Sequence, residues 1–467
     1  MSVNDFFSIL PAILFALFGT ALLLLRFDST RFYVIFLTVA EVLAAVALWR
    51  QSDFLGLTGF QGAVLVDSFG IFVNAVCLAA ALLCALGAYR YLEGQDENHP
   101  EFYSLILLAQ AGMYLMVSGT ELITVFIGLE TAALSFYVLT GFLRTNPRSN
   151  EAALKSLLLG AFSSGLLLYG FSVLYGLTGS THYPRIAAML SNRIPNDPLI
   201  LLAVIPIILG LLFKAAAAPL HMWAPDAYDG APTPVTAYLS TASKAASVAL
   251  LLRLVLGPLH EFRPAWEAII TFAALASLTV GNLAALTQSS VKRMLAYSSI
   301  GHVGYILLGL VAGNQTGIEA MLLYLLVYTL MTTGAFLLLA GMSHDGVIDF
   351  RSLLYRQPGV ALLMIILLLS LAGLPPTAGF MAKYMIFLSL IQARQYWIAI
   401  VAALYVAVSL YYYFRIVREM VHQSEEPGAT VTMSTGWRAA VGVSALLSLA
   451  LGLNPEPVLA WARSAIR

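Results

Sequence analysis

Charged residues are scarce in this sequence. Asp, Glu, Lys and Arg together make up 10% of the 467 residues, whereas soluble domains carry about 25%. Hydrophobic residues make up 60%, and the mean hydropathy is +0.86. A soluble fold of this length cannot bury so much apolar surface. The composition therefore excludes a soluble globular protein and predicts an integral membrane protein.

Other absences exclude further classes. The formal net charge is zero, so nothing favours binding to nucleic acid. The two cysteines, Cys77 and Cys84, lie in one apolar run and are typical of small core residues, not of a disulfide framework or metal site. The sequence has no CxxC pair, no GxGxxG after a strand, no Walker lysine loop and no HExxH. We therefore expect no redox centre, nucleotide site or metal in this chain.

Apolar runs of about 20 residues, the length that crosses a bilayer, recur along the chain. The first follows residues 1–5, which lack the basic residues of a signal peptide, so we expect it to remain as a span. The fourteen predicted spans are 4–25, 33–49, 69–92, 102–118, 121–143, 153–177, 199–217, 232–256, 265–286, 291–312, 318–341, 359–390, 396–418 and 436–453. The sequence thus predicts an all-α integral membrane protein of about fourteen transmembrane helices.

Basic residues are unevenly distributed between the two sets of alternating loops. One set carries Arg26, Arg31, Arg90, Arg144, Arg148, Lys292, Arg293, Arg351, Arg356, Arg415, Arg418 and Arg438, and the other carries Arg50, Arg185, Arg193, Arg263, Arg394, Arg463 and Arg467. Basic loops stay on the cytoplasmic side. We therefore expect both termini on the outside.

Two predicted spans, the seventh and the twelfth, are broken by proline. The seventh is interrupted at Pro219, close to Lys214, and the twelfth at Pro375 and Pro376, close to Lys383. Proline ends a helical hydrogen-bond ladder, and a bilayer tolerates the break only where protein or water satisfies the freed groups. Either break alone could be an ordinary kink. Two breaks, each with a lysine, favour a transporter built from repeats.

We therefore expect two inverted five-helix repeats within a single membrane domain, 1–467. Spans one to three occupy residues 1–100. The first repeat, spans four to eight, covers 101–256, and the second, spans nine to thirteen, covers 265–420. The last span is 436–453.

Four ionisable residues stand near the middle of predicted spans: Glu130, Lys214, Lys244 and Lys383. A charge at the bilayer centre costs about 2.5–3.5 kcal/mol, so the set would cost on the order of 10 kcal/mol unpaired. Snorkelling to the headgroups explains lysines at helix ends, but Lys244 lies about twelve residues into its span, roughly 18 Å along it. A buried ammonium gives up its proton readily, and a neighbouring carboxylate opposes that loss. The pattern predicts a proton relay, with Glu130 and Lys214 as its carboxylate–lysine pair.

Other polar residues leave two interpretations open. Lys155 could snorkel or take part in the relay. His221, beside the first break, could serve proton uptake or cap broken backbone. His302 could be a hydrogen-bonded core residue or a relay member, since histidine titrates near neutral pH. We interpret Asp226 and Asp229 as loop or helix-cap residues.

Several motifs of the sequence resemble those of a known family. The run from Lys214 through PLHMWAPDAYDGAPTPVTAYLSTAS to Lys244 resembles subunit N of bacterial respiratory complex I, NADH-quinone oxidoreductase. The stretches EAALK, LGAFSSG, VKRMLAYSSIGHVGY and LAGLPPTAGF are also similar to that family, and the likeness covers all fourteen spans. Within the wider antiporter-like (Mrp-type) group, the HMW phrase and a lysine in span twelve favour subunit N.

The resemblance implies specific roles. Glu130 and Lys214 match the family's carboxylate–lysine pair, Lys244 its central lysine and Lys383 its terminal one. It implies proton translocation driven by quinone reduction, without a cofactor in this chain, while NADH, FMN, Fe–S clusters and quinone are used elsewhere in the complex. It also implies K-type and M-type neighbours in a bacterial cytoplasmic (inner) membrane, with both termini periplasmic. A cation/proton antiporter subunit and a non-pumping structural subunit remain as alternatives.

Overall fold

The computed structural model describes residues 2–25, 31–191, 193–194, 197–344, 347–348, 350–423 and 434–466. The helices are α1 Val3–Ser8, α2 Leu10–Leu24, α3 Arg31–Gln51, α4 Ser68–Glu93, α5 Pro100–Ser118, α6 Leu122–Thr140, α7 Pro147–Thr178, α8 Tyr183–Leu190, α9 Pro198–Lys214, α10 Trp223–Gly230, α11 Thr233–Leu256, α12 Arg263–Leu286, α13 Val291–Ala312, α14 Gln315–Met342, α15 Leu353–Arg356, α16 Pro358–Ala372, α17 Ala378–Gln392, α18 Tyr396–Val421, α19 Thr435–Leu453 and α20 Glu456–Ile466. Short 3-10 helices are η1 Ser52–Phe54, η2 Phe60–Gly62 and η3 His260–Phe262, and two antiparallel pairs are formed by β1 Thr58–Gly59 with β2 Val64–Leu65 and by β3 Ser343–His344 with β4 Val347–Ile348.

The helices confirm the predicted fold class. Within the described part of the chain, eleven helical segments are long and apolar enough to cross a membrane. The shorter apolar helices α2, α9, α16 and α17 account for the remaining predicted spans. The first predicted span is divided at Ile9 into α1 and α2, and the twelfth is divided into α16 and α17.

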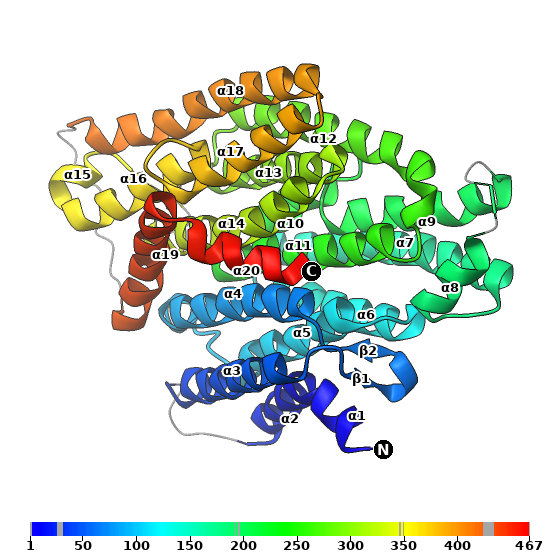
Figure 1. Cartoon of the computed structure of the whole chain (residues 1–467). Coiled ribbons are helices and arrows are strands. Elements are labelled where there is room, and N and C mark those ends of the chain that lie inside the picture. Colours follow the sequence, from blue (N-terminus) through cyan, green and yellow to red (C-terminus); the bar gives the residue numbers. More distant parts are fainter. Residues whose placement is uncertain are drawn as a thin grey trace.

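Several short elements were not predicted, including α8, α15, α20 and the two strand pairs. The buried residues of α20 are Val458, Leu459, Ala462 and Ala465, a spacing of one helical face. Such a helix lies along the protein surface, and its 11 residues are too few to cross a bilayer. Helix α20 lies beside α4 and α14, whereas α8 and α15 lie toward the ends of the bundle (Figure 1).

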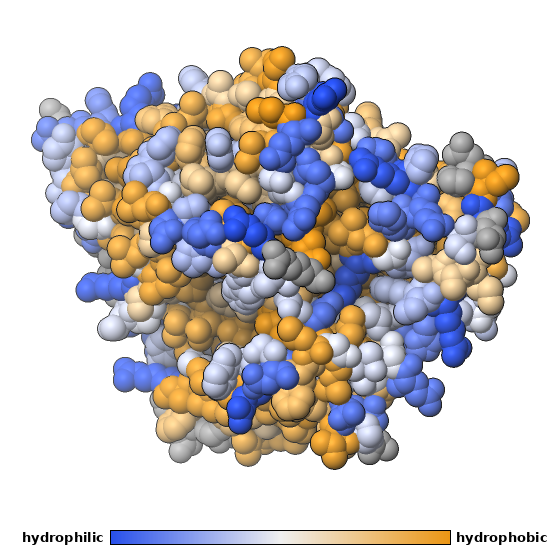
Figure 2. Space-filling model, in the orientation of Figure 1, coloured by the Kyte–Doolittle hydropathy of each residue, from blue (hydrophilic) through white to orange (hydrophobic). Residues whose placement is uncertain are grey.

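The long helices run side by side, from left to right in Figure 1, and the short helices α8 and α15 lie toward opposite ends of the bundle. Figure 2 shows apolar residues along the upper and lower margins of the molecule, parallel to the helices. Helix α18 forms the upper margin, where Ile400 and Leu404 are each 62% exposed. An apolar outer surface of this kind faces lipid tails. The protein is therefore a multi-pass membrane protein.

Both predicted breaks are present. Helix α9 ends at Lys214 and the chain restarts as α10, and α16 ends before Gly373, whose φ is +81°. The freed backbone groups have side-chain partners: the Ser277 hydroxyl accepts a hydrogen bond from Ala218 N at 2.8 Å, and the Ser370 hydroxyl accepts one from Gly379 N at 3.2 Å. Hydroxyl groups on neighbouring turns thus stabilise broken helices inside the bundle.

The division into two inverted repeats stays a prediction, as does the orientation. Two of the orientation charges, Arg26 and Arg467, lie outside the described residues. The centre of the bundle is formed by α11, α13 and α14, nearly all of whose residues are buried.

Candidate functional site

Glu130 and Lys214 form a pair bridged by a serine. The two side chains come from α6 and α9, and Lys214 Nζ lies 3.9 Å from Glu130 Oε1. The Ser164 hydroxyl, on α7, donates to Glu130 Oε1 and accepts from Lys214 Nζ, the latter at 3.0 Å. The structure therefore brings together the predicted carboxylate and lysine and adds a hydroxyl that connects them.

Lys244 lies deep in the bundle on α11, with 1% of its surface exposed. Its ammonium donates to the Ser299 hydroxyl at 2.8 Å and to the Ser299 carbonyl oxygen at 3.1 Å. The rings of Tyr228 and Tyr328 lie 5.5 and 5.9 Å from the nitrogen, within cation–π range. All these partners are neutral. Because its side chain is buried among them, Lys244 does not reach a headgroup layer.

Lys383, on α17, is 3% exposed and reaches back to the broken end of α16. Its Nζ donates to the carbonyl oxygens of Leu371 and Ala372, at 3.1 and 2.8 Å. These carbonyls end α16, where the helix dipole is negative. The Tyr305 ring lies 5.1 Å from the same nitrogen. The break in span twelve thus creates the binding position of its own lysine.

His302 stands between the two deeper lysines. It is 4% exposed, and its Nδ1 lies 2.8 Å from the Tyr324 hydroxyl, while its Nε2 lies 3.2 Å from the Tyr413 hydroxyl. The Tyr413 hydroxyl also hydrogen-bonds the Ser298 hydroxyl. Both ring nitrogens therefore have partners that can donate or accept a proton.

Aromatic contacts join these groups into a row. The Tyr328 ring, close to Lys244, lies 5.3 Å from the His302 ring. The row continues from Tyr324 to Tyr305, whose ring centres are 6.4 Å apart, and Tyr305 faces Lys383. Residues far apart in the sequence thus form an unbroken line of contacts from α11 to α17.

A small cavity lies at the Lys244 end of the row, between Lys214 and the helix that carries Lys244. A space of about 40 Å³ between Lys214 and Ser243, the residue before Lys244, is lined mainly by apolar side chains. This volume admits on the order of one water molecule. The only ionisable groups that line it are Lys214 and Tyr137, so Lys214 and the helix that carries Lys244 border a common space.

The remaining candidates lie apart from this row. Lys155 Nζ binds Asp226 at 2.8 Å and Glu151 at 2.7 Å, and Asp226 also binds Arg293. His221 lies in the break after α9, its Nδ1 has no partner among the described residues, and its backbone carbonyl accepts from Ala224 N. These contacts leave both interpretations open: snorkelling or a relay role for Lys155, and proton uptake or backbone capping for His221.

One sequence interpretation was wrong. Asp226 and Asp229 both lie inside α10, and the N-cap of α11 is Pro232. Asp226 forms ion pairs, and Asp229 accepts a hydrogen bond from Ser290 at 3.2 Å. The misassignment arose because a run rich in Asp, Gly and Pro is typical of a loop.

The neutral members of the row were not predicted from the sequence. Ser164 and the tyrosines at 228, 324, 328 and 413 were not singled out, although a hydroxyl inside an apolar span is a recognisable signal. Glu41 was not singled out either; it is a carboxylate in the middle of the second span and is fully buried in α3.

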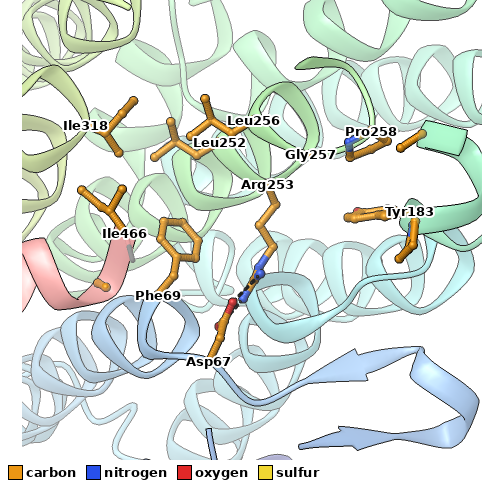
Figure 3. A pocket seen from close by; sticks show the side chains of 13 residues that line it. Asp67, Phe69, Tyr183, Leu252, Arg253, Leu256, Gly257, Pro258, Ile318 and Ile466 are labelled. Carbon is orange, nitrogen blue, oxygen red and sulfur yellow. Dashed lines mark hydrogen bonds and ion pairs between the residues drawn. The ribbon is translucent and has the colours of Figure 1, made fainter. Parts of the chain in front are cut away.

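A separate pocket of about 440 Å³ lies where α4 begins and α11 ends (Figure 3). At its centre Arg253 donates two hydrogen bonds to Asp67, and apolar side chains including Phe69 and Leu252 surround the pair. None of Glu130, Lys214, Lys244 or Lys383 lines it. The pocket is therefore not part of the row.

Within the described residues, no group of three His, Cys, Asp or Glu side chains could hold a metal ion. Cys77 and Cys84 are buried and free. The chemistry that the row can perform is proton transfer between lysine, carboxyl, imidazole and hydroxyl groups, because these are its only reactive members.

Comparison with known proteins gives a consistent result. Residues 119–409 match the family described as "NADH:quinone oxidoreductase/Mrp antiporter, TM". The chain is 53% identical to NADH-quinone oxidoreductase subunit N 2 of Solibacter usitatus, over 99% of this chain and 98% of that one. A chain of respiratory complex I from Thermus thermophilus superposes with a TM-score of 0.81 at 35% identity, covering 97% of this chain and all of the other.

A chain of the Mrp complex from Dietzia sp. has the same fold, with a TM-score of 0.87 at 20% identity, over 100% of this chain and 97% of that one. The fold alone is thus common to antiporters and complex I. The sequence identity separates the two, because the strongly identical relative is a subunit N. The chain therefore belongs to the subunit N family of NADH-quinone oxidoreductase, the antiporter-like membrane subunits of respiratory complex I.

Proposed function

We propose that this subunit carries protons across the membrane through a relay of Glu130, Lys214, Lys244 and Lys383. The observation that supports it most directly is the row of contacts between Lys244 and Lys383. Its members, in order, are Lys244, Tyr328, His302, Tyr324, Tyr305 and Lys383. The burial of two lysines without a carboxylate partner would be costly in a subunit that only holds the complex together.

Glu130 and Lys214, across the small cavity from the helix that carries Lys244, act as the switch of the relay. Glu130 and Lys214 attract each other, so a change in the charge of Glu130 alters how tightly Lys214 holds its proton. Ser164 transmits this change because it bonds to both. Lys244 and Lys383, held by neutral groups, then accept and release the proton in turn through hydroxyl groups and water.

The energy comes from quinone reduction elsewhere in the complex. The relatives are named NADH-quinone oxidoreductase, which supports a place in that complex. NADH, FMN, Fe–S clusters and quinone are proposed to be bound by other subunits of the complex. The subunit transports protons without electron transfer of its own.

The outer surface of the bundle supports two proposed neighbours in the membrane arm. Glu130 is about a quarter exposed and stands on a face where Ile127, Leu134 and Phe162 point outward. A partly exposed carboxylate on an apolar surface is costly in lipid, which supports coverage by a K-type subunit there. We place an M-type subunit beyond Lys383, against α17, where Tyr384 is exposed.

The subunit is proposed to lie in the bacterial cytoplasmic membrane, with both termini periplasmic. Asp53 follows α3 on the side of the N-terminus, and Gln95 follows α4 on the other side; both are exposed. The native cysteines are buried. An impermeant maleimide added to spheroplasts should label Asp53→Cys and spare Gln95→Cys. Labelling of the second variant alone would invert the orientation.

The relay is tested with Lys244→Met and Lys383→Met in the assembled complex. Both variants keep a long apolar side chain and remove the titratable group. We expect proton pumping in vesicles to fall about 10²-fold or more, the usual contribution of a proton-transferring side chain, with quinone reductase activity reduced. Arg394→Gln, at an exposed cation, is the matched control. Normal pumping by either assembled lysine variant would favour a structural subunit, and sodium-dependent transport would favour an antiporter.

A further inference from the structure

Glu41 is a carboxyl group that the proposed relay does not use. It lies in the middle of α3 with none of its surface exposed. Neither of its carboxyl oxygens has a hydrogen-bond partner among the described residues. Among the residues that the structure describes, no other acidic side chain has both oxygens buried and without a hydrogen-bond partner.

The polar groups around Glu41 are neutral. Gln110, on α5, lies beside the carboxyl, and its amide nitrogen donates one of its two hydrogens to the Cys77 carbonyl oxygen at 2.9 Å. The thiol of Cys77 comes from α4, and the hydroxyl of Tyr238, from α11, donates to the Ile106 carbonyl oxygen at 3.3 Å. No cation is paired with Glu41 in the described structure.

Three other carboxylates near or inside the bundle have charged or hydroxyl partners. Asp67 is held by Arg253, and Glu319, which is 8% exposed, is approached by Arg463. Glu130 has Ser164 and Lys214. Glu41 has none of these, and burial of an isolated carboxylate is so costly that such a group retains its proton instead.

We propose that Glu41 is a protonated carboxyl group at neutral pH and forms a proton-binding site between α3, α4 and α5, separate from the row between Glu130 and Lys383. The proton can exchange only when water reaches the junction of these helices. Helix α3 also faces lipid, since Val39 and Val42 are exposed, but Glu41 lies on its buried face. A lipophilic reagent in the bilayer therefore reaches the carboxyl only when the same junction opens.

The protonated form has a defined reactivity. A carboxylic acid adds to a hydrophobic carbodiimide: its oxygen bonds the central carbon, and its proton moves to a nitrogen of the reagent. A shift of the acyl group from that oxygen to the other nitrogen of the reagent, which did not take the proton, leaves a carbonyl at the central carbon and gives a stable N-acylurea. No other reactant is needed, and an ionised carboxylate without a proton does not start the reaction.

Infrared spectroscopy of the whole complex tests the proposal. The difference between the native complex and one with Glu41→Gln should contain the carbonyl stretch of a protonated carboxyl group at neutral pH. The matched control is Glu121→Gln, which removes a carboxylate bonded by Thr124 and Thr181 and should remove carboxylate bands instead. Carboxylate bands in the Glu41 difference would overturn the proposal.

A second measurement serves if the variant does not assemble. The native complex is treated with dicyclohexylcarbodiimide and digested for mass spectrometry. We expect an N-acylurea on the peptide containing Glu41 and an unmodified Glu121. A Glu41 that stays unmodified both in the bilayer and after mild detergent has opened the helix junction, under conditions that label protonated carboxyls of a reference membrane protein to completion, would contradict the proposal. Neither outcome depends on whether Lys244 and Lys383 carry protons.

Discussion

The ammonium nitrogen of Lys383 lies 2.8 Å from the carbonyl oxygen of Ala372, the last residue of α16. A helix that ends inside a membrane exposes carbonyl groups that no lipid can bond. Lys383 bonds two of them, and their negative end stabilises its ammonium. The break and the lysine therefore stabilise each other.

Gly373→Ala should disturb this arrangement. Gly373 has a φ of +81°, and a Cβ there would lie 2.7 Å from Lys383 Cδ. The left-handed backbone alone costs alanine about 1–2 kcal/mol, and the clash displaces the lysine. We expect slower pumping and a lower melting temperature. Gly359→Ala, on the same helix with no atom within 4 Å of its Cβ, is the control and should match the native complex.

Ser164→Ala should weaken the link between Glu130 and Lys214 without removing either charge. One hydrogen bond contributes about 0.5–1.5 kcal/mol, so we expect pumping to slow roughly threefold to tenfold. The control is Ser448→Ala, on α19, whose buried hydroxyl donates to its own helix at Ser444. Equal pumping rates in the two variants would mean that Ser164 transmits nothing.

Asp67→Asn should destabilise the junction of α4 and α11. Asp67 accepts two hydrogen bonds from Arg253, at 2.7 and 2.9 Å, and one from Gly70 N at the start of α4. Loss of a charged partner leaves Arg253 largely buried and unpaired, at a cost of about 1–3 kcal/mol. Thermal unfolding of the purified complex should show the loss. Asp53→Asn breaks a solvent-exposed pair with Arg50 and should change little.

Glu121→Gln should lower stability in a pH-dependent way. Burial raises the pKa of Glu121, but hydrogen bonds from Thr124 and Thr181 outweigh it, so the pKa lies below its usual value of 4.5. The carboxylate therefore stabilises the folded state above that value, and this contribution is lost as the pH falls through the lowered pKa. Between about pH 6 and about pH 8 the difference in melting temperature between native and variant should stay constant. A difference that changed within this range would show that another group is responsible.

Tyr324→Phe should remove the hydroxyl that bonds His302 Nδ1 while keeping the ring contact with Tyr305. If protons pass through this hydroxyl, pumping slows although assembly is unchanged. Tyr103→Phe removes a buried hydroxyl on α5 that is bonded to Asn98 at 2.9 Å, away from the row, and serves as the control. Unchanged pumping in Tyr324→Phe would restrict His302 to a structural role.

The spans, the broken helices and the buried lysines were determined by the sequence itself. The hydropathy of each run requires a helix in lipid, because only a helix satisfies its backbone internally, and Pro219 and Pro376 fix where two of them break. The surface helices α8 and α20 were not predicted, because their apolar faces are short and are buried only by packing against the bundle.

Only the tertiary structure decided which residues meet. Lys244 and Ser299 are 55 positions apart, and Ser164 and Lys214 are 50 apart. No local pattern specifies such contacts, because they depend on how neighbouring helices pack around each other. For the same reason a carboxylate in the second span gave no hint of its surroundings. The sequence required Glu41 to be in the membrane, and the packing of α3 against α4 and α5 left it without a partner.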